Sequence, residues 1–426
     1  MQYHRPFIMG CLIRALGILV LAGCSMLQSS SLVASGVPLQ TSEGTPENRE
    51  KLSLAINDFG LDLLRTLTTD SGKNAVLSPV SIHAALSMTM NGAVGETAEQ
   101  MRRVLHIDGM AATETNDAWA DLLVRLEKDN TAQTLEIGNS LWARQGIAFK
   151  QTFIATDRDS FGAQLATLDF AAQDAAEAIN RWVSTSTHGR IATIVDKTPS
   201  NAILYLANTV YLKADWANPF EKKATAAMPF HRKDGAAIDV QMMRQGELMP
   251  YAENATVQAT TLPYKGDKSE FHVLLPKPGI TIEAALADLN GAGFKVLRDA
   301  LTSARMAHVN LGLPRLDSEY SARLRNSLME LGMARPFDDH SAQFTAMADF
   351  SAPIFISDVA HKTRIKITEE GTEAIAATLV MEGAGAAPPG DDPVHDLICD
   401  HPYLFAIVDH ASGAMLFLGV VNDPTQ

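Results

Sequence analysis

The chain reads TEEGTEAIAAT from Thr368 to Thr378, directly after an extended apolar segment at residues 354–367. A threonine such as Thr372 followed by alanines is typical of a capped helix. Residues 381–393, which come next, are rich in Gly, Ala and Pro and indicate a long exposed loop. Loops of this length in a compact domain are usually functional or disordered. An alanine-rich segment between a strand and such a loop therefore has an alternative role, as a strand that enters an existing sheet.

The side chains of this segment alternate in a way that suits insertion. If Thr372 faces the interior, then Ala374, Ala376 and Thr378 face it as well, because strand residues alternate between two faces. All of these are small, as they must be, since a closed sheet has no room for bulk. Ile375 then points outward, and the preceding Gly371 supplies backbone freedom for the movement. The alternation favours an inserting strand over a capped helix.

Outside this segment, helical patterns come first and strands follow. Ser78 is expected to cap a helix with Pro79 at its first position. An α+β fold with a helix-rich N-terminal half and large mixed sheets is expected, in one domain at residues 49–426. Apolar spacing predicts helices at residues 49–65, 79–90, 96–105, 118–128, 171–187 and 318–331, and strands at residues 202–213, 249–264, 270–275, 308–316, 354–368, 397–399, 404–408 and 414–420.

The composition is that of a globular protein and argues against nucleic-acid binding. The 426 residues are 46% hydrophobic and 20% charged, which is ample for a large core. The net charge of −14 opposes phosphate binding, which requires a basic surface. Of three cysteines, only Cys399 lies in the expected domain, so no disulfide is expected within it.

The first 24 residues have the features of a secretory signal. Arg5 and Arg14 precede a short apolar run at residues 15–22, and the sequence Leu-Ala-Gly-Cys ends at Cys24. This ending resembles the bacterial lipobox, which implies that Cys24 is lipidated; an ordinary cleaved signal is the alternative. Residues 25–48 are expected to be a flexible tether. The expected location is the bacterial outer membrane, on its periplasmic or surface side, or the medium after release.

Motifs for catalysis are missing from the sequence. We find no phosphate-binding glycine loop, no His-Glu-x-x-His pair and no Gly-x-Ser-x-Gly elbow. The 12 histidines are scattered, so neither a metal nor a cofactor is expected. A Ser-His-Asp triad assembled from distant residues stays open, but no residue is singled out for it. The prediction is that the protein is not an enzyme.

The stretch Glu-Glu-Gly-Thr-Glu-Ala-x-Ala-Ala-Thr at residues 369–378 resembles the proximal hinge of inhibitory serpins, a family of serine protease inhibitors. Other segments resemble serpins in the same order along the chain. They are residues 77–98, the pair 179–183 and 187–191, the strand-like segment 206–216, His361-Lys362-Thr363, and the C-terminal stretches 400–405 and 417–424. Tyr403 replaces the usual phenylalanine.

The resemblance implies a serpin fold with an exposed reactive loop and a suicide mechanism. A target serine protease would attack that loop, form a covalent complex, and be trapped when the loop inserts into the main sheet. The scissile bond would be Gly385–Ala386, with Ala384 as an alternative position. These small residues suit a narrow, elastase-like pocket. The inserting hinge would comprise Glu369, Glu370, Gly371, Thr372, Glu373, Ala374, Ala376, Ala377 and Thr378.

The resemblance also implies which residues control opening of the sheet. Ser78, Ser81, Asn208 and His361 match a polar cluster beneath the point where the strands part. Trp216 and an expected Glu369–Arg315 pair match the upper end, where insertion begins. The protein is expected to act as a monomer.

Two other functions stay open within the family. One is a non-inhibitory serpin that serves as a cell-surface binding protein, and the other is an inhibitor of cysteine proteases. The small inward residues of the hinge argue against the first, since a loop that never inserts need not keep them. Glu382 would face inward after insertion, which is costly for a charge unless it lies at the end of the sheet.

Overall fold

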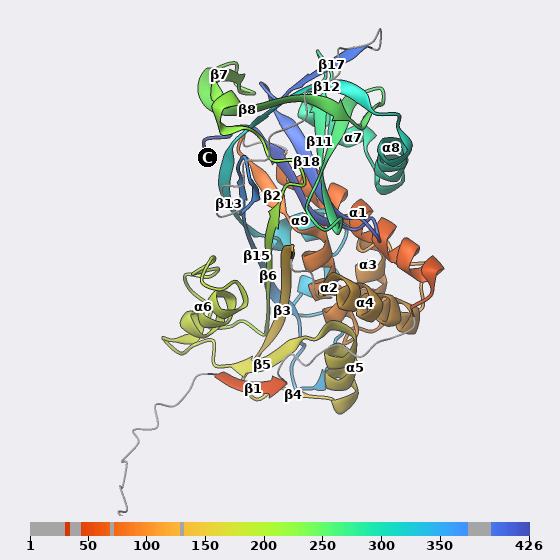
Figure 1. The fold of residues 1–426 in the computed structure, drawn as a ribbon. Helices are drawn as coiled ribbons and strands as arrows, with labels where there is room; N and C mark the ends of the chain where they lie inside the picture. The colour runs from red at the N-terminus through yellow and green to blue at the C-terminus, as the bar shows by residue number, and fades with distance from the viewer. Residues whose placement is uncertain (1–29, 35–43, 69–71, 128–131, 374–392) are drawn as a thin grey trace, which may run out of the picture.

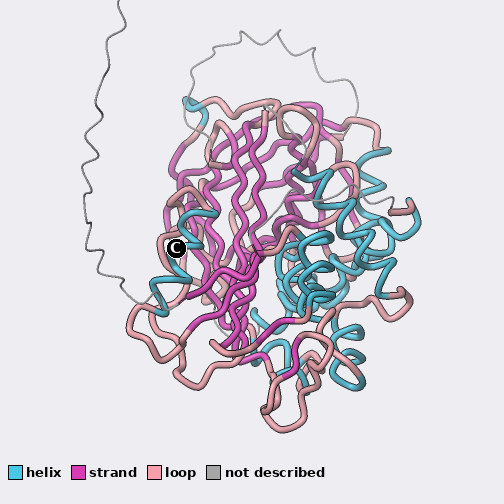
Figure 2. Tube along the Cα trace, turned by 90° about the horizontal axis from the view of Figure 1, so that it is seen from below, coloured by secondary structure: helices cyan, strands magenta, loops and turns pink. Residues whose placement is uncertain are grey.

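The computed structural model describes residues 30–34, 44–68, 72–127, 132–373 and 393–426. Strands form layers with most of the helical chain on one side (Figures 1 and 2), which confirms the predicted α+β fold. The helices are α1 (Pro46–Thr68), α2 (Pro79–Met90), α3 (Gly95–Val104), α4 (Ala112–Glu127), α5 (Gln151–Phe161), α6 (Ala175–Ser186), α7 (Ile282–Asp288), α8 (Gly291–Ser303) and α9 (Arg325–Glu330). None of the helices in the described ranges has the length and apolarity needed to cross a membrane.

The main sheet joins strands from both halves of the chain in the order β1-β5-β3-β6-β16-β15-β13. Its long central strands are β3 and β6, which pair antiparallel, and β15, which pairs antiparallel with β13. The strands are β1 (Ser30–Ala34), β3 (Gln133–Arg144), β5 (Gln164–Leu168), β6 (Leu204–Asp215), β13 (Leu316–Arg323), β15 (Ile356–Ile367) and β16 (Gly371–Thr372).

Two further sheets stand above and behind the main sheet (Figure 1). In the second sheet every residue of β18 and β19 is buried, as expected for apolar runs covered on both faces. This sheet comprises β2 (Ala75–Leu77), β19 (Met415–Val421), β18 (Tyr403–Asp409), β11 (Ser269–Pro276), β10 (Val257–Pro263) and β9 (Tyr251–Glu253). The third comprises β17 (Val394–Ile398), β12 (Ala307–Pro314), β8 (Ala237–Met249) and β7 (Ala226–His231), and a small pair joins β14 (Ala348–Asp349) to β4 (Ala148–Phe149).

Helix α2 is buried along its whole length and supports the main sheet from behind. It begins at Pro79, as predicted, with Ser78 in the extended conformation of an N-cap residue. The predicted capping bond is wrong, however, because the Ser78 side chain accepts no hydrogen bond from the helix. Ser78 instead contributes through its backbone N–H, as described below.

The helix predicted at residues 318–331 is wrong over most of its length. Residues Leu316–Arg323 form strand β13, and only the short helix α9 follows. The side chains of β13 alternate, with Leu316 and Ser318 buried and Asp317 and Glu319 exposed, which is the period of a strand. Pairing with β15 along the full length of β13 outweighs the local helix propensity.

Other predicted boundaries also differ from the structure. The single strand expected at residues 249–264 is divided among the end of β8, β9 and β10, with the breaks at Pro250 and around Asn254. Strands β3 and β5 were not predicted in the helix-rich half. Within the predicted tether, Ser30–Ala34 forms β1, which pairs antiparallel with β5 at the edge of the main sheet, and α1 begins at Pro46.

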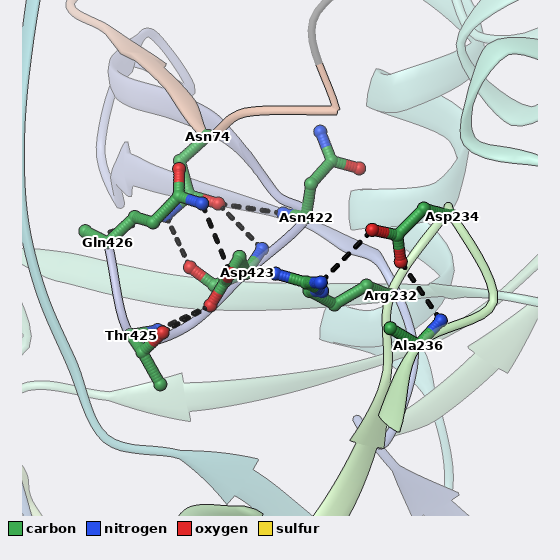
Figure 3. Close-up of polar contacts among 8 residues, drawn as sticks. All are labelled: Asn74, Arg232, Asp234, Ala236, Asn422, Asp423, Thr425 and Gln426. Atoms are coloured by element: carbon green, nitrogen blue, oxygen red, sulfur yellow. Dashed lines mark hydrogen bonds and ion pairs between the residues drawn. The ribbon is translucent and has the colours of Figure 1, made fainter. Parts of the chain in front are cut away.

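A polar cluster fastens the C-terminus after β19 (Figure 3). The Asn74 side-chain oxygen accepts the backbone N–H groups of Asn422 and Asp423, at 2.8 and 2.9 Å. The Asp423 carboxylate in turn accepts from Thr425 and from Arg232, which comes from the loop after β7. The end of the chain is therefore fixed to two distant segments.

Candidate functional site

The two central strands of the main sheet, β6 and β15, are paired at one end and separated at the other. They pair in parallel from Ile356 with Leu204 up to His361 with Asn208. Beyond that point, residues 209–213 of β6 and 362–366 of β15 have no direct pairing with each other among the described strands. We call the last paired position the fork and the unpaired stretch above it the slot. A slot inside a sheet is a ready site for one additional strand.

Strand β16 already occupies the upper end of the slot. Thr372 pairs with Ile367 of β15 on one side and with Ala214 of β6 on the other. Gly371 has a φ of +152°, and a Cβ atom there would lie 2.2 Å from the carbonyl oxygen of Ala214. Only glycine fits this close approach of two backbones. Gly371 and Thr372 of the predicted hinge are thus inserted as a short strand.

The fork is held by a buried, uncharged network centred on His361. The backbone N–H of Ser78 donates to His361 Nε2 at 3.2 Å, so the ring proton lies on Nδ1 and faces Asn208 Oδ1 at 3.3 Å. Burial lowers the pKa of His361 to about 3, and the ring is neutral at pH 7. The Ser78 hydroxyl has no hydrogen-bond partner within the described ranges.

Asn208 extends this network to the neighbouring elements. Its side-chain amide donates to the carbonyl of Ser81 at 2.7 Å and to Asn139 Oδ1, on β3, at 2.8 Å. The Ser81 hydroxyl donates to the carbonyl of Thr209, the first residue of the slot. We call these residues the fork cluster: Ser78, Ser81, Asn139, Asn208 and His361. The four predicted from the sequence are brought together, and Asn139 was not predicted.

The upper end of the slot is held by aromatic rings. The Trp216 indole N–H donates to the carbonyl of Thr368 at 2.9 Å, and its ring stacks on Tyr264 with 4.6 Å between centroids. The Tyr264 hydroxyl lies 2.5 Å from Thr372 Oγ1, inside the buried region. Trp216 therefore holds the chain before the hinge, and Tyr264 contacts the inserted residue itself.

Charged groups fix the backbone just before the inserted strand. The predicted pair is present: Arg315 Nε and Nη2 both contact the Glu369 carboxylate, at 2.6–3.0 Å. The Glu369 side chain is 3% exposed and also accepts from Thr225 Oγ1 at 2.6 Å. Burial alone would raise the pKa of Glu369, but the hydrogen bonds from Arg315 and Thr225 lower it. Glu370 pairs with Lys222 at 2.5 Å.

Glu373 is the last hinge residue that the structure describes. Its φ is +52°, and its N–H donates to the carbonyl of Lys366 at 2.8 Å. Its carboxylate is largely buried, 3.7 Å from Arg190, and burial raises its pKa. We call Trp216, Tyr264, Thr225, Lys222, Arg315 and residues 368–373 the hinge cluster. Ala374, Ala376, Ala377, Thr378 and the predicted scissile residues Ala384, Gly385 and Ala386 lie outside the described residues.

Three residues that contact the hinge were not predicted from the sequence: Tyr264, Thr225 and Lys222. Tyr264 follows strand β10, and its contact with Thr372 joins residues far apart in the chain. Thr225 and Lys222 lie in the segment between β6 and β7, with no local pattern that links them to Glu369 or Glu370. Only the three-dimensional pairing of β16 with β6 brings these groups to the hinge. The one relevant signal in the sequence was the pair of acidic residues Glu369 and Glu370 before Gly371. Such residues, when buried, require basic or hydrogen-bond-donating side chains beside them.

Comparison with known families agrees with this geometry. The family model described as Serpin (serine protease inhibitor) matches residues 54–424. The chain is similar to an uncharacterised serpin-like protein of Thermococcus kodakarensis, at 34% identity over 403 residues that cover 92% of this chain and 90% of that protein. It is also similar to the leukocyte elastase inhibitor of Homo sapiens, at 30% identity over 88% of this chain and all of that protein.

Among solved structures, the chain is similar to the thermophilic serpin tengpin in its native state. The TM-score is 0.83 and the identity 26%, over 93% of this chain and 100% of tengpin. The similarity therefore extends over both the fork and the hinge, and not over one sheet alone.

Proposed function

This chain belongs to the serpin family of serine protease inhibitors, and from that premise we propose that it is a suicide inhibitor that traps its target by loop insertion. One observation carries the proposal: Thr372 lies between β6 and β15 at the top of a slot in which no other described strand lies. A strand that begins insertion there can continue toward the fork without breaking any existing pairing between β6 and β15. The protein itself would catalyse nothing; the chemistry belongs to the protease.

The proposed reaction begins with cleavage of the loop. The protease serine Oγ attacks the carbonyl carbon of Gly385, and the bond to the nitrogen of Ala386 breaks. That nitrogen leaves as an amine with the proton taken from the serine, and an ester joins Gly385 to the protease. Release from the peptide bond frees the hinge to fill the slot as a full strand. Each added residue forms hydrogen bonds on both sides, which makes insertion favourable.

Small residues around the scissile bond favour an elastase-like protease. A narrow primary pocket accepts Gly or Ala, whereas a trypsin-like pocket requires a basic residue. The similarity to a protein named leukocyte elastase inhibitor supports the same class. If Ala384 is the residue read by the protease, the class is unchanged because it too is small.

A serpin that binds partners without inhibiting proteases is the second candidate function. The buried Thr372 and the close-packed Gly371 favour the inhibitor, because a loop that never inserts has no need for either. A cysteine protease as target remains the third candidate, with a thioester in place of the ester.

We further propose that the protein acts as a monomer anchored by lipid on Cys24. The support is the Leu-Ala-Gly-Cys sequence at residues 21–24. Metabolic labelling with a fatty acid tests the anchor. Incorporation that disappears in Cys24→Ala supports it, and an unlabelled protein that begins at another residue would favour an ordinary cleaved signal.

Incubation with an elastase-like serine protease tests the inhibitory function. We expect a complex that survives denaturing electrophoresis, and mass spectrometry should place the cleavage at Gly385–Ala386 or beside Ala384. Trypsin under the same conditions is the matched control for specificity. If several proteases that cleave after small residues cut the loop and form no covalent complex, the inhibitory function is contradicted and the binding function is favoured.

A further inference from the structure

Two turns of the second sheet bring three metal-binding side chains together. The turn between β10 and β11 carries Asp267, and β11 itself carries Glu270, whereas the turn after β18 carries His410. Ligand atoms of these three residues all lie within 4.8 Å of one another. The turns are fixed to each other, because the N–H of His410 donates to the carbonyl of Lys268 at 2.8 Å. The grouping therefore follows from the fold and not from neighbours in sequence.

Glu270 lies at the centre of the group, between two histidine rings. Its Oε1 is 2.6 Å from His410 Nδ1, and its Oε2 is 3.2 Å from His272 Nε2. The Glu270 side chain is only 12% exposed. Both oxygens of this largely buried carboxylate therefore face an imidazole nitrogen.

His272 is the observation that separates this group from an ordinary surface cluster. Its ring is 1% exposed, with Nδ1 hydrogen-bonded to Thr261 Oγ1 at 2.9 Å and its plane nearly perpendicular to the ring of Phe294. Its Nε2 atom points at Glu270 but makes no hydrogen bond with any described group. A buried ring nitrogen without a good partner is costly. Such an atom beside a carboxylate is expected where the carboxylate also serves another ligand.

We propose that Asp267, Glu270 and His410 bind a divalent transition-metal ion, with zinc as the preferred one. Zinc accepts both imidazole nitrogens and carboxylate oxygens as ligands, and three such ligands leave a fourth position for water. The two carboxylates balance the charge of the ion. The ion takes the place of the hydrogen on His410 Nδ1, which leaves the ring with its proton on Nε2, and it replaces the contact of Nδ1 with Glu270. His272 acts as a positioning residue that orients the second oxygen of Glu270.

A second group in the same molecule provides an internal control. Asp338, Asp339 and His340 also bring ligand atoms within 4.8 Å, but they are consecutive and all exposed. No buried polar atom without a partner stands behind them in the described part of the chain. The proposal therefore assigns the ion to the His410 group and not to the His340 group.

The position of the site links it to the hinge cluster. The turn that carries Asp267 begins at Tyr264, whose hydroxyl contacts Thr372. An ion at Asp267 would tie this turn to the turn after β18 and so stiffen the support of the inserted strand. Because only the folded chain assembles the three ligands, bound zinc should also raise the melting temperature.

Isothermal titration of the chelator-treated full chain with zinc chloride tests the proposal. We expect one saturable site whose affinity falls at least about tenfold in His410→Ala and in Glu270→Gln. His340→Ala should bind as the unsubstituted chain does. His410 and His340 are exposed side chains, so neither substitution should disturb folding, and circular dichroism checks this.

Two further measurements sharpen the test. His272→Phe keeps the ring contact with Phe294 and should weaken zinc binding roughly 10–100-fold if His272 positions Glu270. Zinc should raise the melting temperature of the unsubstituted chain and of His340→Ala, but not of His410→Ala. No saturable binding, equal affinity in His410→Ala, or loss in His340→Ala instead would each overturn the proposal. None of these results depends on whether the chain inhibits a protease.

Discussion

The fork cluster and the hinge cluster hold the same two strands by different means. At the fork, β6 and β15 are joined by a neutral network in which every predicted side chain is buried. At the upper end, β16 keeps them apart, and the contacts are a charged pair, a second charged pair and two stacked rings.

The difference indicates how the sheet can open and still remain stable. When neutral groups separate, no unpaired charge remains in the interior, so opening the fork costs less than breaking a buried charged pair. The hinge cluster instead fixes its residues through Glu369, whose buried carboxylate requires Arg315. We therefore interpret the fork as the place where β6 and β15 would separate more readily, and the hinge cluster as the group of contacts that would restrain insertion.

The largest expected effect comes from Thr372→Arg. Thr372 is buried against the Tyr264 hydroxyl, and an arginine there would bury a cation without a partner. We expect insertion to slow enough that the stoichiometry of inhibition rises roughly tenfold or more, measured by titration of an elastase-like protease. Ile375→Arg, whose residue lies outside the described ranges and is assigned by alternation to the outer face, should still inhibit. Equal inhibition by both variants would contradict the hinge assignment.

The second prediction tests the neutrality of the fork through pH. The pKa of His361 falls from 6.5 to about 3 on folding, so the unfolded chain binds the proton more readily. The stabilisation is complete above pH 6.5 and is lost as pH falls from 6.5 toward 3. The loss attributable to His361 should be on the order of 5 kcal/mol.

Urea unfolding of the unsubstituted chain and of His361→Ala across this pH range measures the effect. His83 is also buried, and its pKa is lowered to about 4, but it contributes equally to both proteins. The difference between the two therefore reports His361. Parallel pH dependence in the two proteins would mean that His361 is not held neutral at the fork.

The third prediction compares two arginine–carboxylate pairs of the main sheet. Arg315→Ala leaves the buried Glu369 carboxylate without its main partner, whereas Arg364→Ala removes a pair with Asp317 that is exposed on both sides. Hydrogen exchange at the Glu373 amide should accelerate roughly tenfold in Arg315→Ala, a cost of about 1.5 kcal/mol. Arg364→Ala should change it little. Similar exchange in both variants would show that Glu369 does not restrain the hinge.

The smallest effect is expected from Trp216→Phe. Phenylalanine retains the stacking on Tyr264 but loses the indole N–H bond to the carbonyl of Thr368. That bond should contribute about 1 kcal/mol to the free energy of unfolding at neutral pH, as measured by urea denaturation. A loss well beyond this value would mean that the ring, and not the hydrogen bond, carries the role of Trp216.

Local patterns predicted the elements that depend on local chemistry. Helix α2 begins at Pro79, as the Ser-Pro pair indicated, because the signal and the structure both lie within a few residues. Strand β13 was missed because the pairing with β15 that stabilises it is not visible in its own composition. The Glu369–Arg315 pair and four of the five residues of the fork cluster were expected through resemblance to a family, and the structure brings them together. Asn139 was not expected.

The residues that were not predicted all lie far along the chain from the hinge residues that they contact. Tyr264 reaches Thr372, and Thr225 reaches Glu369, only after the sheets have assembled. No periodicity or turn signal near Tyr264 indicates this contact. The identity of the residues inserted below Thr372 likewise stays a prediction, because it concerns residues beyond Glu373 that the structure does not describe.

Strand β1 limits the distance between a lipid anchor on Cys24 and the folded domain. Figure 1 places β1 at the opposite end of the molecule from β17, the strand that follows the reactive loop. If Cys24 carries lipid, the residues between it and Ser30 span at most about 20 Å, even fully extended. The segment that links the lipid to the folded domain is then shorter than the tether predicted at residues 25–48. The β1 edge of the main sheet would lie next to the membrane. Strand β17, at the other end of the molecule, would then face away from the membrane.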